Sequence, residues 1–273
     1  MTRREWLAGA AVLAAGPPLR AAGGALTVAS LDHINLHVPD VQRAADFYVK
    51  LFGTVVSRTA SAPAKPGSAR SVIWFLRLGE NVLAISTAGP GEKAGLDHYC
   101  FSIDAYKGEE VRPKVAGLNE MTPNAPPGNL WLKDPDGYVI QLNGGDRGET
   151  PGRAVGAVLI DPPAGTMREP AFHAKAITAL MLPVADRNAS EAYYRKALGS
   201  DAEGKAKYSF RAGPSQVVLV PASAGLRLRI SIDGFNAGAA LTKLKDLGIH
   251  DAKREKGMVV FHDLDGIGIE LSA

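Results

Sequence analysis

Apolar and polar positions alternate along the chain so that short strands and helices are predicted to follow one another. Residues 31–38 alternate with a period of two, which is typical of a strand with one buried face. Asp40 is suited to cap a helix, and apolar residues at helical spacing predict that helix over 41–52, ending at Gly53. The same order of a strand, a helix and further strands then starts again. We predict a second helix over 109–117 and further strands over 71–78, 82–86, 98–103, 129–133 and 138–143.

This pattern is repeated in the second half of the chain. Residues 31–39 match 177–184 with an offset of 146, and the same offset matches the helices that follow. Residues 133–142 match the second half with an offset of 129. Matching blocks in one order predict two related domains. We place them at residues 30–143 and 176–273, joined by a linker rich in glycine and proline at 144–172.

Residues 1–25 are predicted to be a signal peptide. Arg3 and Arg4, followed by Trp6, resemble the twin-arginine export signal, and an ordinary secretory signal is the alternative. The apolar run at 7–15 is about nine residues long, against the roughly 20 that a membrane-spanning helix needs. We therefore expect export to the periplasm or the cell exterior, with no membrane span.

Composition limits the chemistry that the chain can use. A formal net charge of +3 gives no electrostatic footprint for nucleic acid. Cys100 is the single cysteine, which excludes an intramolecular disulfide and a cysteine-rich zinc site. Any metal must therefore be held by histidine, carboxylate or amide groups.

Three side chains are candidates for such a metal site. His33 lies on the first strand of the first strand–helix unit, His98 on the first strand of the second unit, and Gln141 on the last strand. If the two units pack as pseudo-twofold mates, their strands curl into a trough in which the three side chains converge. Two imidazoles and one oxygen donor leave coordination positions open for substrate oxygens.

The chain resembles the vicinal oxygen chelate superfamily, which includes glyoxalase I, bleomycin-resistance proteins and extradiol dioxygenases. The resemblance rests on residues 31–34 leading into 46–53, on 96–99, and on 132–142 around Asp134-Pro135-Asp136-Gly137. It implies an α+β fold with two such domains in tandem. Each domain would consist of two βαβββ units that form a curled, trough-like mixed sheet.

The resemblance also implies a divalent metal, Fe, Mn, Zn, Ni or Co, on His33, His98 and Gln141. Gln141 stands where most members of the superfamily have glutamate. Its amide oxygen can coordinate, but it carries no negative charge and cannot act as a base. We therefore expect weaker metal binding than in those members, or a different preferred ion.

Other residues are expected to line the trough. Asn35 and His37 share the face of His33, and Cys100 shares that of His98, so all are candidates for substrate contact. A surface histidine at a strand end and a small buried thiol are the alternatives for His37 and Cys100. Three aromatic residues are expected to form an apolar wall: Trp74, Phe75 and Trp131.

The second domain lacks these ligands. Ala179, Arg227 and Glu270 stand at the positions of His33, His98 and Gln141. We expect Arg227 to pair with Glu270 and take the place of a metal, so that this domain is structural or shapes the ligand site. The alternative is a pairing of units across the domains that brings Glu270 to His33.

Three functions follow from this sequence. The first is an enzyme whose metal chelates vicinal oxygens of a small substrate, with dioxygenase, lyase or isomerase chemistry. The second is a metal-free protein of the bleomycin-resistance type that binds a small molecule. The third is a structural interaction module. We expect a small-molecule partner, and a monomer or a homodimer.

Overall fold

The computed structural model describes residues 26–53, 55–60, 72–121, 130–144, 158–160, 169–198 and 207–273. The predicted signal peptide at 1–25 lies outside the described residues, so its prediction stays a prediction. Within the described part of the chain, no helix combines the length and apolar character needed to cross a membrane.

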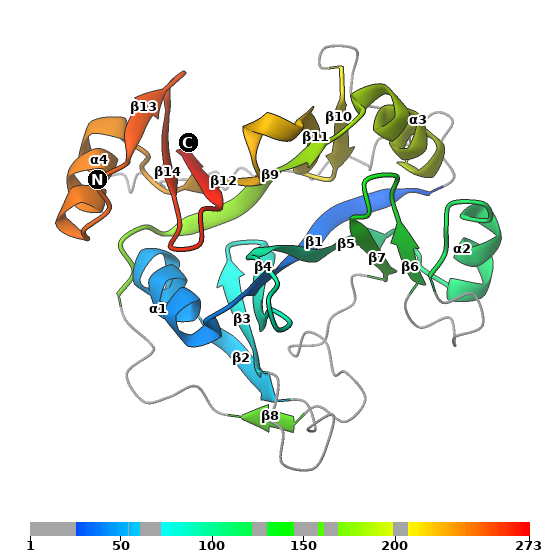
Figure 1. The fold of residues 1–273 in the computed structure, drawn as a ribbon, viewed down its shortest axis with the longest axis horizontal. Coiled ribbons are helices and arrows are strands. Elements are labelled where there is room, and N and C mark those ends of the chain that lie inside the picture. Colours follow the sequence, from blue (N-terminus) through cyan, green and yellow to red (C-terminus); the bar gives the residue numbers. More distant parts are fainter. Residues whose placement is uncertain are drawn as a thin grey trace, which may run out of the picture.

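The first half of the chain forms an eight-stranded mixed sheet in the order β6-β7-β5-β1-β4-β3-β2-β8, shown in Figure 1. The described residues of this half include two helices, α1 (Val41–Phe52) and α2 (Gly108–Lys114). The strands are β1 (Val28–Val38), β2 (Val55–Ala60), β3 (Val72–Leu78), β4 (Asn81–Thr87), β5 (Gly95–Ile103), β6 (Leu130–Lys133), β7 (Val139–Asn143) and β8 (Val158–Ile160).

The second half repeats this arrangement in a seven-stranded sheet with the order β10-β11-β9-β12-β15-β14-β13. Its helices are α3 (Arg187–Leu198) and α4 (Ala237–Asp246), with a short 3-10 helix η1 (Ala222–Ala224). The strands are β9 (Ala174–Val184), β10 (Ser209–Ala212), β11 (Ser215–Pro221), β12 (Arg227–Ile232), β13 (Lys253–Glu255), β14 (Met258–His262) and β15 (Gly268–Ser272).

The predicted fold class, tandem domains each with a curled mixed sheet, is confirmed by this topology. Within each half, the first strands of the two units pair antiparallel, β1 with β5 and β9 with β12. The alternative pairing of units across the domains is therefore wrong. Among the described residues of the first half, two strands were not predicted: β2, and β8, which lies in the segment expected to be a linker and pairs with β2.

Helix α1 shows how local sequence sets up the fold. The side chain of Asp40 accepts a hydrogen bond from the backbone N–H of Arg43 at 3.0 Å, which caps the first turn. The helix ends at Gly53, whose φ of +92° favours glycine. One face, including Ala44 and Tyr48, is buried against the sheet. This packing fixes the helix on one side of β1, β3 and β4.

Each strand of the first sheet has two distinct faces. On β1, Ile34 and Leu36 lie in the main core, on the side of the helices. The alternate residues, such as His33 and Asn35, face the opposite, concave side. A separate small cluster of Phe75, Val82 and Ala84 forms on that concave side. The candidate site therefore lies outside the main core.

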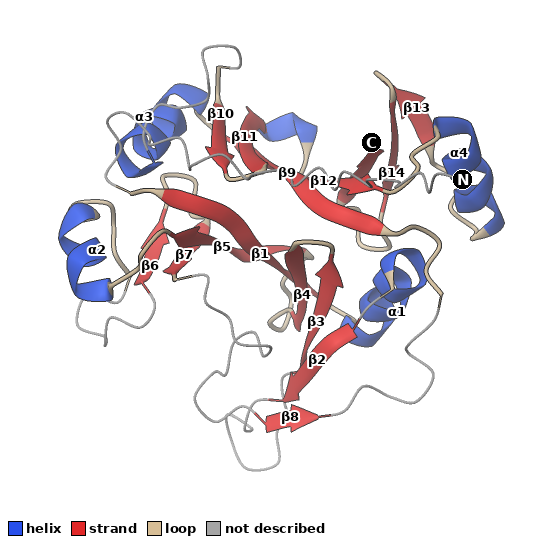
Figure 2. Ribbon diagram, turned by 180° about the vertical axis from the view of Figure 1, so that it is seen from behind, coloured by secondary structure: helices blue, strands red, loops and turns tan. Residues whose placement is uncertain are grey.

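The two halves dock reciprocally. The hydroxyl of Tyr48 on α1 donates to Asp263 Oδ2 in the β14–β15 turn at 2.7 Å, and Tyr194 on α3 donates to Asp134 Oδ2 in the β6–β7 turn at 2.7 Å. All four side chains are buried. Figures 1 and 2 show α3 beside the β6–β7 hairpin and α1 beside β14. The contacts are equivalent in the repeat, so the halves are related by a pseudo-twofold axis.

A second pair of reciprocal contacts joins the hairpin turns to the first strands. The β3–β4 turn contains Gly79, and the N–H of Glu80 donates to the carbonyl of Lys175 on β9 at 3.0 Å. A Cβ at Gly79 would lie 1.6 Å from that carbonyl oxygen. In the other half, a Cβ at Gly213 would lie 2.2 Å from the carbonyl oxygen of Ala29. Both turns therefore require glycine for close approach.

Candidate metal centre

The register of adjacent strands places the predicted ligands on one face. His33 on β1 lies opposite Cys100 on β5, and Cys100 lies opposite Gln141 on β7. Asn35 lies opposite His98. Because paired residues share a face, these five side chains all belong to the concave side of the first sheet. His33 is 8% exposed and Gln141 is 9% exposed, so both are buried there.

The two histidines are in direct contact. Their Nε2 atoms lie 2.9 Å apart, and the rings meet edge to face with centroids 5.0 Å apart. Asp97 Oδ2 contacts His98 Nδ1 and accepts a hydrogen bond from Asn35 Nδ2 at 3.3 Å. A carboxylate on Nδ1 keeps the proton there, which leaves Nε2 of His98 with its lone pair toward His33.

The ionisation of these groups suits metal binding. Burial, and then the neighbouring His98, lowers the pKa of His33 to about 3, so its imidazole is neutral at physiological pH. The hydrogen bond to His98 lowers the pKa of Asp97, which keeps that carboxylate charged. Neutral imidazoles backed by a carboxylate are the form in which histidine binds metals.

The spacing of the nitrogens also fits an ion. Two nitrogen ligands, each about 2.1 Å from a metal and at right angles to one another, lie about 3 Å apart. The observed 2.9 Å between Nε2 of His33 and Nε2 of His98 matches this value. The residues present therefore fit a divalent metal held by His33 and His98.

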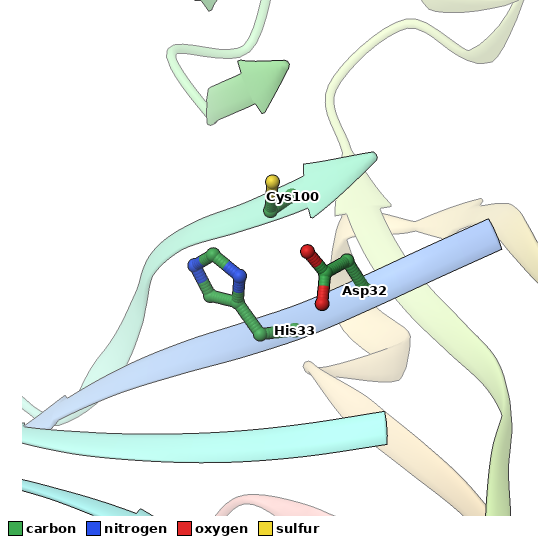
Figure 3. A group of neighbouring side chains, drawn as sticks. All are labelled: Asp32, His33 and Cys100. Atoms are coloured by element: carbon green, nitrogen blue, oxygen red, sulfur yellow. The ribbon is translucent and has the colours of Figure 1, made fainter. Parts of the chain in front are cut away.

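Asp32 is a neighbour that the strand pattern did not predict. Strict alternation puts Asp32 on the face opposite His33, but a β-bulge between Leu31 and His33 disturbs the register. Asp32, His33 and Cys100 each offer one atom that could coordinate a metal, and these three atoms lie within 4.8 Å of one another. Figure 3 shows Asp32 and His33 rising from β1 toward Cys100 on β5. The bulge thus adds a carboxylate to the site.

The other predicted residues of the trough, Trp131, His37 and Cys100, lie in three different surroundings. Trp131 lies opposite Gln141 and packs edge to face on His98, with ring centroids 5.0 Å apart. Nε2 of His37 lies 3.1 Å from the carbonyl oxygen of Lys93, at the end of the trough. Cys100 is fully buried, and burial raises the pKa of its thiol well above the ordinary value, so the thiol stays protonated.

The expectation that Trp74 lines the trough is wrong. Trp74 is 1% exposed and belongs to the main core. Its register partner is Ile85, also in the main core, whereas Phe75 pairs with Ala84 on the concave side. The prediction failed because it rested on residue type, and the period of two on β3 turns Trp74 away from His33.

The second half has lost the ligands at the same place. Glu270 contacts Arg227 Nη1 at 3.5 Å, as predicted, and also Arg229 Nη2 at 2.8 Å. Arg229 stands at the position of Cys100, and Ala179 at that of His33. Two guanidinium groups therefore occupy the space where the first half has its candidate ligands.

Comparison with known proteins identifies the first domain. Residues 30–142 match the family model described as Glyoxalase/Bleomycin resistance protein/Dioxygenase superfamily. The first domain belongs to this superfamily. No curated protein sequence matches the chain. Membership agrees with the resemblance seen in the sequence around His33, His98 and the 134–137 turn.

Solved structures of the same fold cover both halves. A triple mutant of 4-hydroxymandelate synthase from Streptomyces coelicolor is 15% identical with a TM-score of 0.60, over 89% of this chain and 92% of that chain. The 2,3-dioxygenase LapB from Pseudomonas sp. KL28 is 12% identical with a TM-score of 0.56, over 90% and 94%. An extradiol ring-cleaving dioxygenase from B. fuscum is 15% identical with a TM-score of 0.56, over 94% and 74%. The tandem fold of these structures therefore extends along the chain.

Proposed function

We propose that this protein is a metal-dependent enzyme that binds a divalent ion on His33, His98 and Gln141. The observation that carries the proposal is the pair of Nε2 atoms at 2.9 Å, with Asp97 behind His98. A bound ion would supply Lewis acidity toward two neighbouring oxygens of a small substrate. The protein supplies the two imidazoles and the buried, concave surface around them.

Dioxygenase chemistry is the reaction class that we favour over lyase and isomerase chemistry. Among the structures that share the tandem fold are a 2,3-dioxygenase and an extradiol ring-cleaving dioxygenase. Two imidazoles with one oxygen donor leave positions open for substrate and suit iron in oxygenases. Aromatic vicinal diols are therefore the first substrates to test, and Fe²⁺ is the first metal.

Two neighbouring side chains are suited to hold such a substrate. Trp131 presents an aromatic ring beside His98, against which a substrate ring can pack. Asn35 is buried, and within the described residues its Oδ1 has no hydrogen-bond partner. A buried acceptor without a donor is costly, so we infer that a substrate hydroxyl donates to it.

Asp32 compensates in part for the neutral amide of Gln141. Its carboxylate has a donor atom within 4.8 Å of one on His33. A negative charge this close to a histidine ligand attracts a divalent cation bound by that histidine, even without coordinating the cation. We infer that Asp32 contributes charge to the site and that Gln141 contributes an oxygen ligand.

Elemental analysis of protein purified without a histidine tag tests the proposal. We expect a near-stoichiometric divalent metal in the wild type and its loss in His33→Ala and His98→Ala. His262→Ala is the matched control, because His262 also contacts a carboxylate, Asp251 at 2.8 Å, but lies on β14 of the other half. This variant should keep the metal. Oxygen consumption with a catechol, measured on the iron-loaded protein, then tests the reaction class.

The alternative is the metal-free binding protein, which rests on the direct hydrogen bond that the two histidines can form. If the wild type takes up no iron, manganese, zinc, nickel or cobalt on reconstitution, the metal-dependent enzyme is rejected. Binding of an aromatic ligand that survives a chelator would then support the alternative.

We also propose that the protein is exported by the twin-arginine route. Arg3 and Arg4, followed by an apolar run at 7–15, support this proposal. Replacing both arginines with lysine should retain the full-length protein in the cytoplasm. Unchanged export of that variant would favour an ordinary secretory signal.

A further inference from the structure

The second half holds a cavity of about 430 Å³ on its concave side. A row of register partners crosses the sheet here, from Arg211 on β10 through Gln216 on β11 and Ala179 on β9 to Arg229 on β12. Partners in one row share a face of the sheet. In the first half, the equivalent row has His33 at the place of Ala179. The small alanine therefore leaves room between the two arginines.

The wall of this cavity is positively charged. Arg211 and Arg229 both line it, together with the carboxylate of the last residue, Ala273, so two guanidinium groups outnumber a single negative charge among the described lining residues. Glu270 contacts two guanidinium groups, those of Arg227 and Arg229, so this cluster keeps a net positive charge. The contact with Glu270 uses Nε and Nη2 of Arg229, and Nη1 takes no part in it. Glu270 thereby holds the guanidinium group of Arg229 in place without neutralising the positive charge of the cavity lining.

Other lining groups complement an anion. The hydroxyl of Ser209 donates to Gln216 Oε1 at 2.8 Å, which orients the amide so that its nitrogen remains as a donor. Met258 and Pro214 add apolar surface to the cavity. The volume falls within the range of small-molecule sites, roughly 300–1,000 Å³. Donors and cations on one side with apolar surface on another suit an anionic group carried on a small organic body.

We propose that this cavity is a binding site for a small anion, recognised through its carboxylate or phosphate oxygens by Arg211 and Arg229. Guanidinium groups bind such oxygens with paired, charge-assisted hydrogen bonds. The site is independent of the candidate metal centre, since none of the residues that form it belongs to the first half. It gives the second half a ligand of its own.

Calorimetric titration of the full chain with benzoate and, separately, with inorganic phosphate tests the proposal. We expect saturable binding of at least one probe, weakened about tenfold or more in Arg211→Leu, where a charge-assisted contact is lost. Arg195→Leu is the matched control, because Arg195 is an exposed arginine on α3 away from the cavity. It should bind as the wild type does. Arg211 is itself exposed, so its replacement should leave the fold intact.

The outcomes distinguish a carboxylate ligand from a phosphate ligand, and the cavity of the second half from the candidate metal centre. Tighter binding of benzoate would assign a carboxylate with an apolar body, and tighter binding of phosphate would assign a phosphate group. Binding that persists in His33→Ala would place the probe in the second half, whatever becomes of the metal. The proposal is overturned if neither probe binds at millimolar concentration, or if Arg211→Leu and the wild type bind equally.

Discussion

A single extra residue on β1 decides which charges reach the candidate metal centre. Without the bulge, Asp32 would point into the core on the far side of the sheet from His33. With it, a carboxylate and an imidazole from consecutive positions face the same trough. The equivalent strand β9 is irregular at Thr178, the position that corresponds to Asp32. Both halves therefore have the bulge, but only the first half has a charged residue, Asp32, at that position.

At this scale, Gln141→Glu should strengthen metal binding. The substitution keeps the oxygen ligand and adds a negative charge next to the ion. We expect the affinity for Mn²⁺ or Zn²⁺ to rise by about tenfold or more, since even a well-screened unit charge a few ångströms away contributes about 1–4 kcal/mol. Competition with a calibrated chelator measures this. An unchanged affinity would show that residue 141 does not contact the metal.

Asp263 should make stability depend on pH in a defined direction. Burial raises the pKa of this carboxyl, so ionisation costs more in the folded state than in the unfolded chain. Its contribution is therefore full at low pH and is lost as pH rises through the folded pKa. Relative to Asp263→Asn, which cannot ionise, the wild type should lose stability as pH rises above 3.8, the ordinary pKa of an aspartate. Urea unfolding of both proteins at each pH tests this, and a flat or rising difference contradicts it.

At the scale of elements, the turns that join the halves are the most sensitive positions. Gly79→Ala would place a Cβ 1.6 Å from the carbonyl oxygen of Lys175, at a φ of +60°. The β3–β4 turn must then move away from β9, and we expect a loss of about 3 kcal/mol or more. Thermal and urea unfolding measure this loss.

Gly91→Ala is the control for this substitution. Its φ is +80°, so it bears the same kind of backbone strain, but a Cβ there would meet no atom within 4 Å. We expect a cost of about 1–2 kcal/mol, from the backbone conformation alone. Equal losses for Gly79→Ala and Gly91→Ala would show that the close approach to Lys175 is unimportant.

Most of these elements could be predicted from sequence because their signals are local. The period of two on β1 and the cap of α1 by Asp40 are read from consecutive residues, and both are present in the structure. The bulge at Asp32 depends on the pairing of β1 with β5, and β8 depends on its pairing with β2; both partners lie far away in the sequence. Trp74 shows the same limit, because its face is decided by which strand lies beside it. The contact between His33 and His98 needed the pairing of β1 with β5.

At the scale of the whole molecule, the reciprocal contacts make the halves one cooperative unit. Tyr48 and Tyr194 each donate to an aspartate of the other half, and the main core includes residues of both. Tyr48→Phe would leave Asp263 Oδ2 buried without this donor, at a cost of about 1–3 kcal/mol. We expect one unfolding transition, followed equally by tryptophan fluorescence and circular dichroism, that moves as a whole to lower urea. Two separated transitions would show that the halves unfold independently.

The docking of each helix on the other half's aspartate turn has a consequence for how a duplicated protein can diverge. Once α1 requires the β14–β15 turn and α3 requires the β6–β7 turn, neither copy can be lost without exposing buried surface of the other. The folding role of a copy is then carried by its convex, helix-bearing side, and its concave side is free to change. One ancestral trough can in this way become two pockets of opposite preference, one for a cation and one for an anion, inside a single chain.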